Sequence, residues 1–294
     1  MHKKIDVLVT ISNKKNMIFQ SEILRRSLVK NSNLDFNFHL VIVNDGPIGN
    51  WIPFYNENLY KEIKKNCYTL AKNSFIWKSE CHWQDHLPVR WHVPIQSENF
   101  LFLDADMIVT GDLSEITENN THDICGVPTV AQNIPLEIWK DHLGYKNLSI
   151  ETWKKILIEK KCNFTTTLTN EFIPTCFNFG FLLFNRLNFL EIRKSFTNNV
   201  KNYVNSNLSL EHKKFCAQLA LTATILQLEI KFKKLDLKYN LPDFDCFFKH
   251  LNNCKVLHYL NSKNISSDYF LNMPDLNQYQ SIMLKYFLEF YPKI

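Results

Sequence analysis

The chain is predicted to form a mixed α/β fold, in which helices flank a central sheet of mostly parallel strands. Short β-branched and apolar runs occur at Ile5–Ile11, Phe38–Val43 and Phe100–Leu103, and each is suited to a strand buried on both faces. Between the first two runs, Met17–Val29 carries apolar residues at helical spacing. Strand, helix and strand in this order are typical of a parallel sheet covered by helices.

The C-terminal half is predicted to continue with both kinds of element. We expect strands at 123–130, 176–185 and 255–259, and helices at 136–143, 151–161, 186–204, 210–228 and 276–291. Gly144 is expected to end the first of these helices, and Ser209 to cap the start of the fourth. The last helix is aromatic and carries few charges, so we expect it to pack against the domain, with a membrane-surface contact as the alternative.

Composition excludes several classes of protein. With 294 residues and 45% hydrophobic content, the chain can bury a sizeable core, as one domain or as two closely joined halves. The net charge of +5 is scattered, which favours a solvated surface over a nucleic-acid-binding stripe. Eight cysteines form no Cys-x-x-Cys pair and are expected to be core thiols. A signal peptide and a long apolar run are both lacking, so we expect a cytoplasmic protein without a transmembrane segment.

Two carboxylates follow the third predicted strand, in the segment Phe100–Leu113. On extended backbone, Asp104 and Asp106 would project to the same side, because side chains alternate along a strand. Ligands of parallel sheets bind outside the carboxyl ends of the strands, where this pair would lie. Carboxylate oxygens suit Mn²⁺ or Mg²⁺. An isolated Asp-x-Asp can equally cap a turn, so the flanking residues have to decide between these readings.

The flanking segment from His86 to Ile116 resembles the metal-binding core of glycosyltransferases with the GT-A (Rossmann-like) fold, and is most similar to the glycogenin-like family 8 type. Such enzymes carry an arginine upstream of an apolar strand that ends in Asp-x-Asp, followed by a Gly-Asp-Leu turn. Arg90, Asp104, Asp106 and the turn beginning at Gly111 occupy these places.

Further similarities extend over most of the chain. Thr10 resembles the nucleotide-contacting loop after the first strand, and Phe177–Gly180 resembles the strand beside the donor sugar. Gln218 resembles the glutamine of an Asp-Gln pair, and His258 resembles the late histidine that supplies a third protein ligand to the metal. The resemblance therefore implies catalytic roles for Asp104, Asp106 and Gln218; nucleotide or donor contacts by Thr10, Ile11, Arg90, Asp104, Ala105, Asp106, Asn178 and Gly180; and metal ligation by Asp104, Asp106 and His258.

Departures from the family pattern and local alternatives remain. Ala217 stands where the aspartate of the Asp-Gln pair would be, and Asn261 where glycine often follows the late histidine. His258 could be a structural histidine, Asn178 could cap backbone groups of its strand, and Arg90 could form a surface ion pair. Three histidines and two tryptophans near Arg90 are interpreted as a packed loop and not as a second metal centre; they are His82, His86, His92, Trp83 and Trp91.

The resemblance implies a metal-dependent glycosyltransferase of the hexosyltransferase type, in one domain over residues 1–294. About 1–116 would form the nucleotide- and metal-binding half, and about 117–294 the acceptor-side half with the C-terminal helix. The donor would be a nucleotide-diphosphate sugar, such as a UDP-sugar, and the cofactor Mn²⁺ or Mg²⁺. The acceptor, whether glycan, lipid or protein, and the oligomeric state are left open, with a homo-oligomer among the alternatives.

The family implies retention of anomeric configuration. Inversion would need a carboxylate base near the acceptor, and the candidates are Glu171, Glu211, Asp243 and Asp245. Two other functions stay open: a catalytically degenerate domain that binds a nucleotide sugar, and a haloacid-dehalogenase-like phosphatase. The phosphatase is disfavoured because its Asp-x-Asp motif normally opens the domain and is followed by threonine, whereas methionine follows Asp106.

Overall fold

A computed structural model gives the structure of the chain, and it describes residues 4–12, 15–44, 67–71, 97–117, 124–129, 135–160, 164–166, 172–204, 206, 216–259 and 275–290. The chain forms two compact units. Unit 1 combines Met1–Ser74, Leu101–Asn120 and Asp236–Ile294, and unit 2 combines Phe75–Phe100 and Thr121–Leu235. The C-terminal segment therefore folds together with the N-terminal strands.

Four neighbouring strands in the order β4–β1–β2–β3 form the centre of unit 1. The bounds are Ile5–Ser12 for β1, Phe36–Asn44 for β2, Cys67–Ala71 for β3 and Asn99–Leu103 for β4. The pairs β1–β2 and β2–β3 are parallel. All three strands predicted in this part of the sequence are confirmed, because an apolar run that is buried on both faces is a strong signal.

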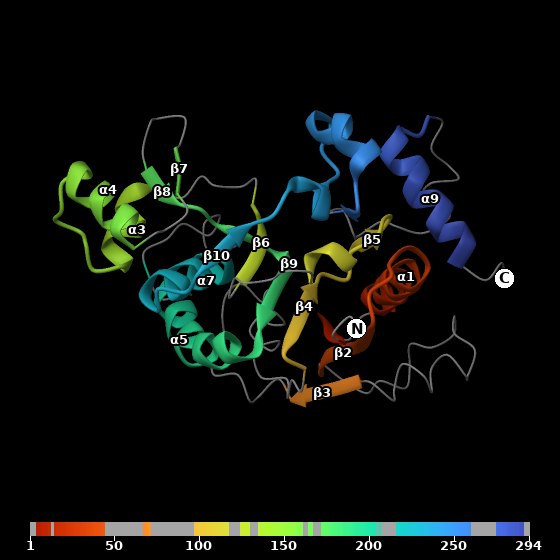
Figure 1. The fold of residues 1–294 in the computed structure, drawn as a ribbon, viewed down its shortest axis with the longest axis horizontal. Helices are drawn as coiled ribbons and strands as arrows, with labels where there is room; N and C mark the ends of the chain where they lie inside the picture. Colours follow the sequence, from red (N-terminus) through yellow and green to blue (C-terminus); the bar gives the residue numbers. More distant parts are fainter. Residues whose placement is uncertain are drawn as a thin grey trace. The chain divides into compact units, whose positions relative to one another are not determined.

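The helix α1, Lys15–Asn31, connects β1 to β2 and lies beside the sheet (Figure 1). Its apolar side chains Ile23, Leu24 and Leu28 are buried. These are the positions that the helical spacing assigned to the core, so the predicted helix and its buried face are both confirmed.

A second, smaller sheet in unit 1 has the order β11–β12–β5. Its strands are Leu241–Pro242 (β11), Val256–His258 (β12) and Met107–Val109 (β5). The strands β12 and β5 pair in antiparallel orientation, and β11 pairs with β12 in parallel. The strand β12 was predicted, as part of 255–259, whereas β5 and β11 were not.

The outer edge of β5 is bonded to side chains of α1. Val109 N donates to Ser27 Oγ at 2.9 Å, and Val109 O accepts from Asn31 Nδ2 at 2.7 Å. Ser27 and Asn31 are one helical turn apart, so they face the strand together. These two side chains satisfy backbone groups of β5 that another strand would otherwise pair.

The C-terminal helix α9, Gln278–Phe290, packs into the core of unit 1 beside α1 (Figure 1). Its core residues are Tyr279, Met283, Tyr286 and Phe287, which cluster with Ile23, Ile108, Leu241, Leu251, Leu257 and Tyr259. Asn31 Nδ2 also donates to Tyr286 Oη at 2.8 Å. The predicted packing of this helix against the domain is confirmed.

The strands of unit 2 have the order β10–β6–β9, with bounds Phe232–Lys234, Ile124–Pro128 and Phe177–Asn185. The pair β6–β10 is parallel and the pair β6–β9 is antiparallel. Two helices, α5 (Arg186–Val204) and α7 (Cys216–Gln227), pack against each other and against β9. Nearly every residue of α7 is buried, as expected for its largely apolar sequence. The predicted cap Ser209 lies outside the described residues.

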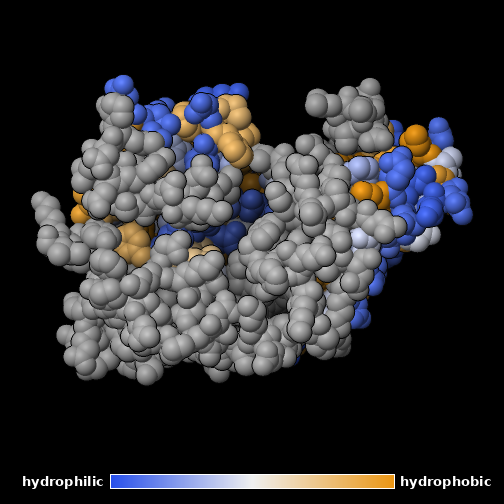
Figure 2. Space-filling view, turned by 180° about the vertical axis from the view of Figure 1, so that it is seen from behind, coloured by the Kyte–Doolittle hydropathy of each residue, from blue (hydrophilic) through white to orange (hydrophobic). Residues whose placement is uncertain are grey.

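The rest of unit 2 contains α3 (Leu136–His142), α4 (Ile150–Glu159) and the antiparallel pair β7 (Phe164–Thr166) and β8 (Phe172–Pro174). Gly144 has φ of +81°, which confirms that it ends the turn after α3. In Figure 2 the coloured surface at the edge formed by these helices mixes hydrophobic and hydrophilic residues. Within the described ranges, no helix is both long and apolar enough to cross a membrane.

Candidate metal centre

Asp104 and Asp106 flank a turn between β4 and β5. The strand β4 ends at the fully buried Leu103, and a turn at Ala105 and Asp106 leads directly into β5. Tyr259 N donates to Asp106 O at 3.0 Å, which fixes the backbone of this turn. The two carboxylates are therefore brought together by a turn. Our expectation that they share one side of an extended strand was wrong, because the backbone at residues 105 and 106 forms a turn, with Ala105 buried.

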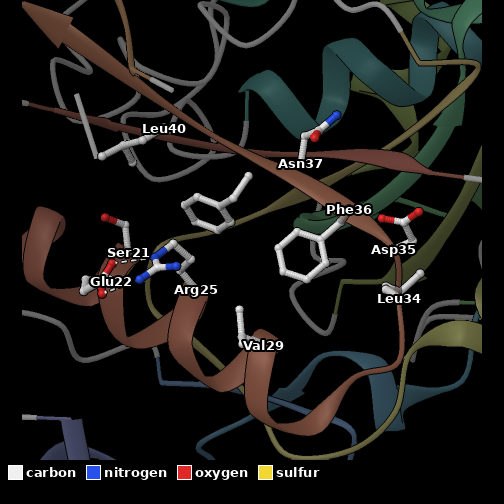
Figure 3. A pocket seen from close by; sticks show the side chains of 10 residues that line it. Ser21, Glu22, Arg25, Val29, Leu34, Asp35, Phe36, Asn37 and Leu40 are labelled. Carbon is white, nitrogen blue, oxygen red and sulfur yellow. Dashed lines mark hydrogen bonds and ion pairs between the residues drawn. The ribbon is translucent and has the colours of Figure 1, made fainter. Parts of the chain in front are cut away.

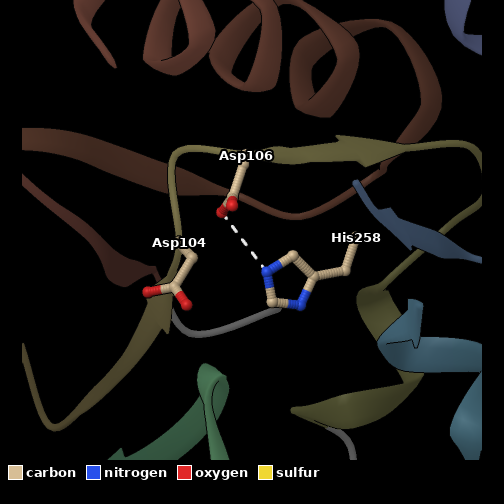
Figure 4. Close-up of side chains that lie close together, drawn as sticks. All are labelled: Asp104, Asp106 and His258. Atoms are coloured by element: carbon tan, nitrogen blue, oxygen red, sulfur yellow. Dashed lines mark ion pairs between the residues drawn. The ribbon is translucent and has the colours of Figure 1, made fainter. Parts of the chain in front are cut away.

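His258, the last residue of β12, lies beside the two carboxylates. The antiparallel register sets His258 opposite Met107, the residue after Asp106. His258 Nε2 lies 3.3 Å from Asp106 Oδ1, and the two side chains point toward each other (Figure 4). One ligand atom each from Asp104, Asp106 and His258 lie within 4.8 Å of one another. The structure thus gathers the three predicted metal ligands into one cluster.

The imidazole of His258 is held from its other side. His258 Nδ1 lies 2.8 Å from Asn240 Oδ1, and both side chains are almost fully buried. Asn240 follows the short 3₁₀ turn Leu237–Tyr239 (η6). Our sequence reasoning missed Asn240, since nothing in its local sequence marks it as the partner of a histidine eighteen residues further on.

The charge of the cluster acts on His258. Burial lowers the pKa of the imidazole, but the charge of Asp106 and its hydrogen bond, with the charges of Asp104 and Asp243, raise it by more. The net pKa therefore lies above the usual value of a histidine. The carboxylates therefore favour positive charge at this place, whether on the imidazole or on a bound cation.

The donor set fits a divalent metal ion. Two carboxylates and one imidazole nitrogen are ligands that Mn²⁺ accepts, and a cation bound by them leaves positions open for other oxygen ligands. Metal–ligand bonds of about 2.1 Å place neighbouring ligands roughly 3 to 4 Å apart, so the cluster needs only small side-chain movements. A ligand histidine commonly donates its second ring N–H to a carboxylate or a carbonyl oxygen, as His258 can to Asn240.

The Gly-Asp-Leu turn that follows β5 anchors the motif. Asp112 Oδ1 accepts from Asn33 N at 2.8 Å and from Ser114 N at 3.1 Å, while Asp112 Oδ2 accepts from Ser114 Oγ at 2.6 Å. These hydrogen bonds hold the pKa of the Asp112 carboxyl well below its usual range, the bond from Ser114 Oγ having the largest effect. Asp112 therefore ties the segment after β5 to the end of α1.

Three other predicted donor residues lie in unit 1. Thr10 and Ile11 are buried near the carboxyl end of β1, and Ala105 is buried in the turn between the two carboxylates. Thr10 Oγ1 has no hydrogen-bond partner among the described residues. Arg90 and the neighbouring histidine and tryptophan cluster lie outside the described residues.

The remaining predicted residues lie in unit 2. Asn178 Oδ1 accepts from Gly180 N at 2.6 Å, which is a backbone contact of the kind that the structural alternative for Asn178 requires. Gly180 is buried within β9. Gln218 lies in the first turn of α7, and its Oε1 is buried without a partner in the described part of the chain. Donor contacts by these residues stay predictions.

A cavity of about 400 Å³ also lies in unit 1 (Figure 3), and its lining includes none of the three residues of the metal cluster. It is bounded by α1 and the start of β2, and its lining includes Arg25, Glu22, Phe36 and Phe38. Arg25 forms an ion pair with Glu22 at 2.8 Å. The cavity is at the amino end of β2, whereas ligands of parallel sheets bind at the carboxyl ends, so it is not the expected donor site.

Comparisons with known proteins place the fold. No protein-family model matches the chain, and no curated protein matches it. Among solved structures, apo glycosyltransferase GlyE from Streptococcus pneumoniae TIGR4 aligns at 15% identity and a TM-score of 0.52, over 97% of this chain and 60% of GlyE. The apo bifunctional glycosyltransferase WbbM aligns at 12% identity and 0.50, over 98% of this chain and 52% of WbbM.

An active-site mutant of LgtC aligns at 11% identity and a TM-score of 0.53, over 93% of this chain and 98% of LgtC. The chain thus spans about 60% of the length of GlyE and about half that of WbbM. At these identities the likeness shows the fold, which is the GT-A fold of glycosyltransferases, as predicted.

Proposed function

We propose that this protein is a metal-dependent glycosyltransferase that moves a sugar from a nucleotide-diphosphate donor, such as a UDP-sugar, to an acceptor. The observation that carries the proposal is the cluster of Asp104, Asp106 and His258 at the carboxyl end of β4, in a chain with the GT-A fold. A GT-A fold without this cluster would support no particular chemistry, because fold alone does not imply function.

Asp104, Asp106 and His258 would hold the metal, with Mn²⁺ favoured over Mg²⁺ because the set includes an imidazole. A bound divalent cation supplies compensation for the negative charge that develops on a departing diphosphate. The protein contributes fixed ligands: Asp106 is held through its backbone by Tyr259, and His258 through its ring by Asn240. Such preorganisation lowers the cost of reorganising the site during the reaction.

The proposed donor contacts are Thr10, Ile11, Arg90, Ala105, Asn178 and Gly180. Thr10 is supported by its buried hydroxyl, which has no partner among the described residues and could serve a ligand. Gln218 is proposed as a catalytic residue, supported by its buried and unpartnered Oε1. The mutant described for LgtC marks an active-site glutamine in a protein of the same fold.

Transfer is proposed to be of the hexosyltransferase type and to proceed with retention. Retention needs no carboxylate base beside the acceptor hydroxyl. Of the four carboxylates considered for inversion, Glu171 and Glu211 lie outside the described residues. Asp243 and Asp245 are described, and Asp243 follows Pro242, which pairs with His258, so Asp243 is the first to test if the product proves inverted.

The remaining alternative is a degenerate GT-A domain that binds a nucleotide sugar without transferring it. Ala217, buried beside Gln218, keeps this alternative open, because the family resemblance places an aspartate there. The phosphatase alternative loses its support, since it required a different fold.

The experiment incubates purified protein with Mn²⁺ and a panel of nucleotide sugars, and measures released nucleotide diphosphate. We expect release with one donor, loss of release on chelation of the metal, and loss in Asp106→Ala. Asp275→Ala, at an exposed carboxylate in the same unit, is the matched control and should keep the activity. Metal-dependent nucleotide binding without release would establish the degenerate alternative, and release unaffected by Asp106→Ala would refute the proposal.

A further inference from the structure

We infer that Asn240 is the positioning residue of the candidate metal centre. Its amide oxygen holds the ring of His258 so that Nε2, and not Nδ1, presents a lone pair to the ion. This inference rests on the proposed function, because it concerns the same site, and it adds to that site a residue that touches neither the metal nor the substrate.

The contact between Asn240 and His258 is short and buried. Asn240 Oδ1 lies 2.8 Å from His258 Nδ1, and the two residues are each 3% exposed. Both groups are buried, and in a low-dielectric interior the bond is stronger than it would be at the surface. The carbonyl oxygen of an amide accepts and does not donate, so the Nδ1 that faces it carries the proton.

Asn240 is itself held in place by backbone bonds. Asn240 N donates to Leu237 O at 2.9 Å, which closes the turn η6, and Lys255 N donates to Lys238 O at 2.8 Å, which ties that turn to the segment entering β12. Asp236 Oδ1 accepts from Lys238 N at 2.8 Å at the start of the turn. The amide is therefore positioned by the same unit that carries His258, before any ligand binds.

The orientation of the amide decides the state of the ring. With Oδ1 toward the ring, Nδ1 keeps its proton and Nε2 can bind a cation. The reverse orientation would point Nδ2 at Nδ1, and the neutral ring would then carry its proton on Nε2, where a metal has to bind. Asn240 Nδ2 has no hydrogen-bond partner in the part of the chain that the structure describes, whereas Asn240 Oδ1 bonds to the ring of His258.

Asp106 cannot do the same task once a metal is present. Asp106 Oδ1 lies 3.3 Å from His258 Nε2, and this contact could orient the ring. When Asp106 and His258 both bind an ion, that direct contact is replaced by two metal–ligand bonds. The bond to Asn240 is on the far side of the ring and persists, as outer-shell partners of ligand histidines do.

The first test measures Mn²⁺ affinity by electron paramagnetic resonance, without donor or acceptor. Asn240→Leu keeps the side-chain volume and removes the acceptor, so we expect affinity to fall about tenfold or more. Asn240→Asp keeps an acceptor for Nδ1–H and should restore affinity to the parent level or above. Asn252→Leu, the same change at an exposed asparagine in unit 1, should leave affinity unchanged.

Either of two results would overturn the inference: parent affinity in Asn240→Leu, or a loss in Asn240→Asp as large as in Asn240→Leu. The second result would mean that Asn240 acts through packing alone. Thermal melting of the metal-free variants shows whether they fold. If Asn240→Leu does not fold, two measurements still test the inference: the Mn²⁺ affinity of Asn240→Asp compared with the parent, and the spectroscopic test below.

The spectroscopic test uses ¹⁵N-histidine-labelled parent protein loaded with diamagnetic Cd²⁺, with His258 assigned by its absence in His258→Gln. We expect Nδ1 to carry a proton and Nε2 to be shifted by the metal; metal on Nδ1 would refute the inference. Both tests are independent of turnover. If Mn²⁺ affinity depends on Asn240 but the protein transfers no sugar, the proposed function fails and this inference stands. If the protein transfers sugar but Mn²⁺ affinity does not depend on Asn240, this inference fails and the proposed function stands.

Discussion

Replacing Ser27 by alanine tests how α1 supports the strand that follows the metal ligands. Ser27 is fully buried; its Oγ accepts from Val109 N at 2.9 Å and donates to Leu24 O at 2.8 Å. The alanine variant leaves the buried N–H of Val109 without that acceptor. An orphaned buried donor costs about 1 to 3 kcal/mol of unfolding free energy. For a chain of this size that corresponds to a fall in Tm of roughly 2 to 12 °C.

The assay is differential scanning calorimetry of the metal-free protein, with Ser281→Ala as the matched control. Ser281 Oγ donates to Asn277 O, just before α9, at 3.0 Å, but Ser281 is exposed and water can replace the bond. We expect the Tm of the Ser281→Ala control to stay close to that of the parent protein. Equal melting temperatures for the two variants would refute the reasoning that Ser27 satisfies the edge of β5. Because β5 begins next to Asp106, Ser27→Ala should also weaken Mn²⁺ binding.

Three further predictions concern acid stability, thiol reactivity and the core. The depressed pKa of Asp112 means that its stabilisation is present above the unfolded pKa of about 4 and is lost as the pH falls below it. Asp112→Asn should therefore lower the free energy of unfolding by about 1 kcal/mol at pH 7 but less at pH 3 in urea titrations. Burial raises the pKa of Cys176 and Cys254 to about 12, so at pH 7.5 iodoacetamide should label the exposed Cys246 first among the described cysteines, as mass spectrometry would show. Phe287→Ala should cost about 3 to 5 kcal/mol in urea unfolding, because the ring is fully buried.

Each of these has an outcome that would contradict it. A difference between Asp112→Asn and parent that is as large at pH 3 as at pH 7 would show that the carboxylate charge is irrelevant. Labelling of Cys176 as fast as Cys246 in folded protein would contradict its burial. The control for Phe287 is Leu288→Ala, at a side chain that is 42% exposed, and similar losses for the two variants would contradict the packing of α9.

Local pattern was sufficient to predict the long elements. The strand β1 is apolar and β-branched and buried on both faces, and α1 places Ile23, Leu24 and Leu28 at helical spacing. Each of these signals lies within one segment. The strands β5 and β11 have only three and two residues, which is too short to show an alternation of apolar and polar residues. They exist because distant segments pair with them.

Some residues of the candidate metal centre were likewise predictable from local sequence, and others were not. Asp104 and Asp106 follow an apolar strand, which made them candidates for a site at a sheet edge, and the resemblance of the flanking sequence then favoured a metal site over a turn cap. His258 was predicted only through a family resemblance, since the pairing of β12 with β5 is a tertiary contact. Asn240 and Ser27 escaped prediction of their roles, because each acts through one hydrogen bond whose partner is set by strand register and helix packing.

The most direct test of the metal centre is a crystal structure of the protein with Mn²⁺, in which anomalous scattering locates the ion. If Asp104, Asp106 and His258 are the ligands, one strong peak will lie within about 2.3 Å of a carboxylate oxygen of each aspartate and of His258 Nε2. A peak elsewhere, or none at these three side chains under saturating Mn²⁺, would contradict the central claim.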